Sequence, residues 1–190
     1  YLLLLLMAST SNATTITYGE IKEFDDKDKV FDLNDLYIRN GKIILKSGTL
    51  ETNSTVITDF FGESGSVTVS GSNSIWNNKN TLNLGVINLH TRYTKTPSKS
   101  GIDIINGAQV YTDKFSMGNY RGTNLDEEGQ YTLNVDGKGS ILKVNQDLIA
   151  SSFDSNRFPI GVVTINIDND GVIEAENVVM HDMDINYDEA

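Results

Sequence analysis

Five copies of one short pattern recur along the chain, and this repeat constrains the fold more than any other feature. Each copy begins with two apolar residues that flank a single residue, and the first members of successive pairs lie 31, 35, 31 and 32 residues apart. The five pairs are Leu36/Ile38, Val67/Val69, Ile102/Ile104, Leu133/Val135 and Ile165/Ile167. A constant period of this length is typical of proteins in which each repeat packs only against its neighbours.

The spacing inside each copy is regular as well. A turn that contains glycine follows each pair, an apolar residue lies five or six positions after the pair, and a second apolar residue comes seven residues later. The turns carry Gly41, Gly71, Gly107, Gly137 and Gly171, and the two later positions are Ile43/Leu50, Ile75/Leu82, Val110/Met117, Ile141/Leu148 and Ile173/Met180.

These copies predict strands rather than helices. Apolar residues alternate with Tyr, Thr, Asp or Asn inside each pair, which is the period-two pattern of a strand with one buried face. Gly, Asn, Asp and Ser interrupt the apolar positions too often for an amphipathic helix. Three short strands in each unit can wind into one coil that stacks on the next at about 4.8 Å, the usual distance between paired strands. The sequence therefore predicts an all-β protein, a parallel β-helix of about five coils.

The expected domain organisation is a single elongated unit. Residues 36–190 form the β-helix repeats and 14–35 form an N-terminal capping segment. The stretches between repeats, 86–101, 119–131 and 151–163, are expected to be loops that project from one corner of the coils. The net charge of −11 disfavours nucleic acid or an anionic membrane as a partner.

The first residues resemble part of a secretory signal. Residues 2–6 are five leucines, a run too short to span a bilayer, and Ser11-Asn12-Ala13 places small residues where signal peptidase requires them. We interpret 1–13 as the remnant of a signal peptide, with mature protein beginning near Thr14; a buried N-terminal strand is the alternative. The absence of cysteine suits a chain that crosses a membrane unfolded.

One unit contains a more specific sequence motif. Residues 69–78 read V-S-G-S-N-S-I-W-N-N and lead into L-N-L-G at 82–85. This resembles the V-S-G-x-x-S-x-W-x-N repeat of autotransporter (type V secretion) passenger domains, and residues 135–142 form a weaker copy. The resemblance implies a right-handed β-helix at the bacterial cell surface, the outer membrane, or outside the cell. It also implies that a C-terminal translocator barrel belongs to the full-length chain.

Two features are candidates for sites and have simpler structural interpretations. Trp76 follows a coil turn and is interpreted as a packing residue rather than a sugar platform. Residues 166–177 place oxygen ligands, Gly171 and an apolar residue as in an EF-hand loop, but position 12 is Asn177. We interpret this segment as an Asx/Gly turn, with weak calcium binding as the alternative. His90 and His181 lie in no metal-ligand motif.

The repeats contain no convergent acid, base, nucleophile or metal-ligand set, so we assign no catalytic, cofactor-binding or metal residues and expect no enzyme activity. The expected function is adhesion or binding to a host-cell surface, extracellular matrix or glycan. Two alternatives stay open: a carbohydrate-active β-helix enzyme that uses loop carboxylates, and a structural spacer. The carboxylates in question are Asp113, Asp126 and Asp154. Aromatic residues that could form a contact patch are Tyr93, Tyr111, Tyr120, Tyr131, Phe153 and Phe158.

Overall fold

Parallel strands make up all the regular structure of the described residues. The computed structural model describes residues 13–58, 63–85, 99–118, 129–151, 161–181 and 184–187, which contain strands and no helix. The strands are β1 Thr14–Ile16, β2 Ile21–Asp32, β3 Leu36–Ile38, β4 Lys42–Thr52, β5 Thr55–Ile57, β6 Ser66–Ser70, β7 Ser74–Leu84, β8 Lys99–Ile105, β9 Gln109–Met117, β10 Gly129–Asp136, β11 Ile141–Ser151, β12 Gly161–Asp168, β13 Val172–His181 and β14 Asp184–Tyr187.

These strands wind into a column with three faces. The first face contains the first parts of β2 and β4, followed by β6, β8, β10, β12 and β14. The second face contains the later parts of β2 and β4 and the first parts of β7, β9, β11 and β13. The third face contains β1, β3, β5 and the last parts of β7, β9, β11 and β13.

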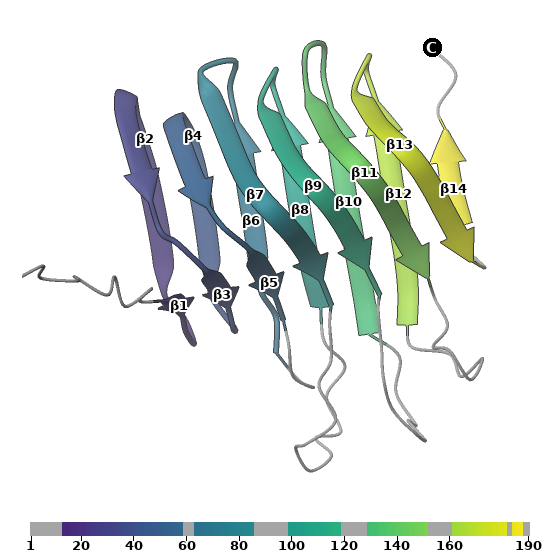
Figure 1. Cartoon of the computed structure of the whole chain (residues 1–190), viewed down its shortest axis with the longest axis horizontal. Helices are drawn as coiled ribbons and strands as arrows, with labels where there is room; N and C mark the ends of the chain where they lie inside the picture. The colour runs from purple at the N-terminus through teal and green to yellow at the C-terminus, as the bar shows by residue number, and fades with distance from the viewer. Residues whose placement is uncertain are drawn as a thin grey trace, which may run out of the picture.

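The described strands form six coils, which begin at β2, β4, β6, β8, β10 and β12. In Figure 1 the chain ascends on the far side, turns over at the top and descends on the near side as it advances from left to right. This winding is right-handed, the hand that nearly all parallel crossovers adopt. The predicted right-handed parallel β-helix is confirmed.

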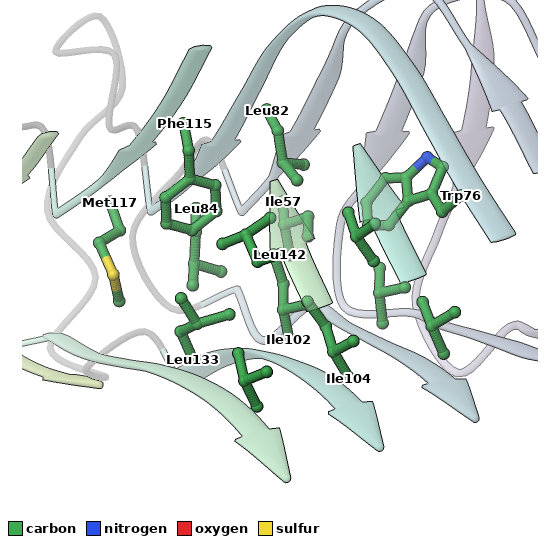
Figure 2. Close-up of a cluster of buried hydrophobic side chains, with 14 of the residues drawn as sticks. Ile57, Trp76, Leu82, Leu84, Ile102, Ile104, Phe115, Met117, Leu133 and Leu142 are labelled. Carbon is green, nitrogen blue, oxygen red and sulfur yellow. The ribbon is translucent and has the colours of Figure 1, made fainter. Parts of the chain in front are cut away.

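The apolar pairs of four predicted repeats form two continuous ladders on the first face. Val67, Ile102, Leu133 and Ile165 are register partners in successive coils, and Val69, Ile104, Val135 and Ile167 form the neighbouring ladder. They point into the column, where side chains from all three faces meet (Figure 2). Burial of these side chains between stacked coils is the main favourable contribution to folding.

The first predicted repeat is wrong in its register. Leu36 and Ile38 lie in β3 on the third face, where they pair with Thr55 and Ile57. The first-face partners of Val67 and Val69 are instead Ile43 and Leu45 of β4. A complete coil occupies only residues 42–57, without a long loop, so the interval between the first two predicted repeats contains more than one coil.

The later apolar positions of the repeat are partly misassigned. Ile75 and Ile141 point outward, whereas the adjacent Trp76 and Leu142 are buried and share one inward ladder with Leu50, Val110 and Ile173. On the third face two inward ladders run side by side. One contains Leu82, Phe115, Leu148 and Val178, and the other Leu84, Met117, Ala150 and Met180. Two consecutive apolar residues make the inward one ambiguous in a period-two pattern.

The N-terminal segment 14–35 belongs to the winding. β1 pairs with β3 and β2 pairs with β4, both in parallel. Phe24 and Phe31 of β2 lie with ring centroids 4.6 Å apart at this end of the column, and Phe24 is buried. Asp25 to Lys29 form an irregular, exposed and charged stretch of β2. Phe24 and Phe31 therefore pack against the apolar column, and the charged stretch of β2 discourages further strand pairing.

Two neighbouring isoleucines on β8 test which residues of the first face point into the column and which point outward. Ile104 is fully buried and Ile105 points outward with partial burial. We expect Ile104→Ala to lower the free energy of unfolding by about 2 to 5 kcal/mol, because it leaves a cavity in the column. Ile105→Ala should cost less than about 1 kcal/mol. Chemical denaturation followed by circular dichroism measures both; equal costs would contradict the assignment of the faces.

Candidate binding surface

The outward side of the first face carries an array of small polar residues in register. The strands direct these residues outward because they alternate with the buried ladders. We call this set the polar array. One row contains Ser66, Gly101, Thr132 and Thr164, and the second contains Thr68, Asp103, Asn134 and Asn166. None of the eight residues is a lysine, an arginine or an aromatic residue. Two lysines border the array on the same face: Lys42 is the register partner of Ser66, and Lys99 lies two residues before Gly101.

Hydrogen bonds between coils orient the second row of the array. The Nδ2 of Asn166 donates to the Oδ1 of Asn134 at 2.7 Å, and the Nδ2 of Asn134 donates to the Oδ1 of Asp103 at 2.6 Å. The hydroxyl of Thr68 donates to the other Asp103 oxygen at 3.4 Å. Each amide thus donates toward the N-terminal end of the column. The chain of bonds ends on a carboxylate, which is a strong acceptor.

Acidic residues mark the edge of the array next to the turns between the first and second faces. Asp136 and Asp168 are register partners in adjacent coils, and the Nδ2 of Asn169 donates to the Oδ1 of Asp136 at 2.7 Å. Together with Asp103, these groups give the face a negative character. The array can therefore offer hydrogen bonds to a neutral, hydroxyl-rich ligand, and its acidic edge disfavours a polyanion on that side.

The corner between the third and first faces is where the connections of variable length leave the column. The amide of Gly85 donates to the carbonyl of Ile57 at 2.9 Å, and the amide of Gly118 donates to the carbonyl of Leu84 at 2.9 Å. These bonds place successive exits one coil apart at the same corner, as predicted. The expected loops 86–101, 119–131 and 151–163 lie mainly outside the described residues. Their described ends, however, belong to β8, β10, β11 and β12.

Glycine is required at one of these exits. Gly118 has a φ of +68°, and a Cβ atom there would lie 2.2 Å from the carbonyl oxygen of Ser151 in the next coil. Backbone atoms cannot move aside as a flexible side chain could. Position 118, where the chain leaves the third face, can therefore be occupied only by glycine.

The candidate catalytic acids do not converge among the described residues. Asp113 lies at the corner between the second and third faces, where the Nδ2 of Asn145 donates to its Oδ1 at 2.9 Å. This corner is distinct from the polar array on the first face. Asp126 and Asp154 lie outside the described residues, as does His90. In the part of the chain that the structure describes, no three His, Cys, Asp or Glu side chains are grouped to hold a metal ion.

Trp76 is a packing residue, as predicted. Its side chain is fully buried, and its Nε1 donates to the hydroxyl of Thr52 at 2.9 Å. Thr52 and Thr55 donate to the Oδ1 of Asn78 at 3.0 and 2.9 Å, and the Nδ2 of Asn78 donates to Thr112 at 3.0 Å. The sequence analysis did not predict this buried polar cluster. The signal that could have revealed it is the position of Asn78, two residues after Trp76 and therefore on the same inward side of the strand.

The segment 166–177 is a strand, a tight turn and a strand, which confirms the Asx/Gly turn. Asn169 and Asp170 have φ values of +50° and +64°, which Asn and Asp tolerate better than most residues. Glu174 points away from the turn on β13, and its carboxylate lies 3.3 Å from the Nζ of Lys143. The oxygen atoms of this segment are therefore spread over different faces.

Among the described residues, the candidate aromatic side chains do not form an exposed patch. Tyr131 is buried in the column, and the hydroxyl of Tyr111 donates to the Oε1 of Gln109 at 2.7 Å on the second face. The other candidates, Tyr93, Tyr120, Phe153 and Phe158, lie outside the described residues.

One surface ion pair perturbs a titrating group. A hydrogen bond from Lys46 to Glu23, together with the attraction between their charges, raises the pKa of Lys46. Both side chains are about half exposed, so this pair contributes little to stability.

Comparison with known proteins adds no relative: no family model, curated protein or solved structure matches the chain. Among the described residues there is also no helix with the length and hydropathy that a membrane crossing requires.

The amide ladder of the polar array can be tested with Asn134→Asp. This change replaces a donor to Asp103 with a second carboxyl, so like charges raise the pKa of the introduced group above its unfolded value. Protonation then relieves the repulsion at low pH, and the loss of stability relative to the natural chain should grow as the pH rises from 4 to 7.

Denaturation midpoints at several pH values provide the measurement. Asn145→Asp is the matched control, because Asn145 also donates to an aspartate but at an exposed corner, where water screens the repulsion. A loss for Asn134→Asp that does not vary with pH would contradict the hydrogen-bonded ladder.

Proposed function

We propose that this chain is an exported, surface-displayed binding module of the autotransporter passenger type, and that it binds a neutral glycan. The polar array is the observation that carries the proposal. It offers hydroxyl, amide and carboxylate groups on four successive coils at the strand spacing of about 4.8 Å. A sugar polymer can contact such a surface through many weak hydrogen bonds at once, and their sum supplies the affinity.

Rigidity favours binding by this surface. The array lies directly above the buried ladders, and inter-coil hydrogen bonds already hold Asp103, Asn134 and Asn166 in one orientation. Little side-chain entropy is then lost when a ligand binds. The acidic edge disfavours anionic polymers on that side of the array, which favours neutral glycans as the ligand class.

Export is proposed from the N-terminal sequence and the start of the fold. β1 begins at Thr14, whose amide donates to the carbonyl of Asp35 at 2.7 Å. The first strand among the described residues thus begins where the signal remnant is expected to end. An exported chain without cysteine depends on strand pairing and core burial rather than on disulfides.

Two substitutions on the array test glycan binding. Thr132→Arg combined with Thr164→Arg places two long cations on an otherwise low surface, and should weaken retention on a neutral polysaccharide by at least about tenfold. The matched control is Thr49→Arg combined with Thr81→Arg, which adds the same side chains outside the first face. Affinity electrophoresis with a panel of neutral and acidic polysaccharides measures the retention.

The same panel distinguishes the other functions. Time-dependent depolymerisation that is lost on changing Asp113, Asp126 or Asp154 to Asn would establish a carbohydrate-active enzyme instead. Equal retention of the two double variants would show that the polar array is not part of the binding surface. No retention of the natural chain on any polysaccharide would favour a spacer.

Export makes a separate prediction about the mature N-terminus. Protein recovered from the surface or medium of the producing cell should begin near Thr14, because residues 1–13 would be removed by signal peptidase. N-terminal sequencing by mass spectrometry gives the answer. Cytoplasmic protein that retains the leucine run would contradict export while leaving the glycan proposal to its own test.

A further inference from the structure

The polar array repeats along the column axis and not along its strands. The outward residues of β8, in strand order, are Lys99, Gly101, Asp103 and Ile105. Their chemistry changes from a cation to an anion to an apolar group within one strand. Across the coils, from β6 to β12, the two rows keep small or polar residues, and these strands lie side by side in Figure 1. A polymer of identical units therefore matches the axial direction, because it too presents the same groups at every repeat.

The array has a defined length in this direction. On the N-terminal side the second row becomes apolar, because Ile44 of β4 is the register partner of Thr68. On the C-terminal side the last described side chains of the array are Thr164 and Asn166 of β12. The array thus spans four coils, spaced at about 4.8 Å. A ligand that lay along a strand would contact only one of these coils.

The hydrogen bonds between coils leave binding groups available to a ligand. Asn134 and Asn166 each donate one N–H toward the preceding coil, and an amide has two. The hydroxyls of Thr132 and Thr164, in the neighbouring row, can each donate or accept. Both coils therefore present the same pair of groups to a ligand, one coil spacing apart.

Gly101 lies in the middle of the first row and is a glycine that the fold does not require. Its φ is not in the left-handed region. Among the described residues, a Cβ atom there would meet only the carbonyl oxygen of Thr132, at the ordinary contact distance of 3.5 Å. Glycine inside a strand lowers stability, and it often marks a place where a ligand approaches the backbone closely. The missing side chain leaves a notch in the row between Ser66 and Thr132.

We propose that the ligand is an extended, β-(1→4)-linked neutral glycan that lies along the column axis, with successive sugars above successive coils and one sugar against the backbone at Gly101. This inference rests on the proposed function and specifies its ligand. A sugar in an extended β-(1→4)-linked chain advances by nearly the distance between two coils, so the polymer stays in step with the array. An α-(1→4)-linked chain curls and leaves the array after a short contact.

Isothermal titration calorimetry of the natural chain tests the direction and the linkage. The probes are β-(1→4)-linked gluco-, manno- and xylo-oligosaccharides from the disaccharide to the hexasaccharide, with the malto-oligosaccharides as the matched α-(1→4)-linked series. For the preferred sugar, the affinity should rise up to the tetrasaccharide and change little beyond it, because four coils carry the array. Maltotetraose should bind at least about tenfold more weakly. Constant affinity from the disaccharide onward, or equal affinity for the two linkages, would overturn the proposal.

Gly101→Val tests the notch. The side chain should lower the affinity for the tetrasaccharide at least about tenfold, while the thermal midpoint should not fall, because valine is favourable in strands and the position has room for it. The matched control, Thr49→Val, places a valine outward on the second face and should leave the affinity unchanged. Equal affinities of the two variants would overturn the proposal.

The outcomes separate this inference from the proposed function. Retention on a neutral polysaccharide of another linkage, with no binding of the β-(1→4)-linked series, would overturn the inference and leave the proposed function standing. No retention on any polysaccharide would overturn both.

Discussion

Register between stacked coils is the constraint on which the rest of the structure depends. A parallel pair shifted by one residue would turn every buried side chain outward, so the ladders through Val67 and Val69 determine which residues reach the surface. The polar array is the other side of the same strands. Its even spacing follows from the packing of the buried ladders beneath it. The spacing that a ligand of the array would contact is therefore determined by the stacking of the coils.

The buried polar cluster around Asn78 holds the corner between the second and third faces. Hydrogen bonds join Asn78 to Thr52 in the preceding coil and to Thr112 in the following one, and Thr52 also receives the indole N–H of Trp76. If one coil shifted in register against its neighbour, several of these groups would be unpaired in an apolar interior, at a cost of about 1 to 3 kcal/mol for each group. Apolar ladders would tolerate such a shift far better. The cluster therefore adds specificity where hydrophobic burial alone is permissive.

The sequence predicted the fold class because alternation and period are properties of single strands and single coils. It misplaced Leu36 and Ile38 because those residues satisfy the same alternation on another face, and only pairing partners distinguish the faces. The choice of Ile75 over Trp76 as the inward residue was wrong for a related reason, because the alternation alone allows either of them to point inward. The polar array could be recognised in part, as a row of Thr, Asp and Asn between apolar residues. Its hydrogen bonds could not, because they join residues more than thirty positions apart.

The direction of the inter-coil hydrogen bonds has a mechanical consequence. Strands lie across the column, so the bonds between coils run along its length. Tension applied to the two chain ends would load the bonds of the terminal coil one after another, as in opening a zipper, while interior coils stay intact. Such a rod yields stepwise from its ends at a force that does not grow with its length, and each step releases the residues of one coil together with its corner connection.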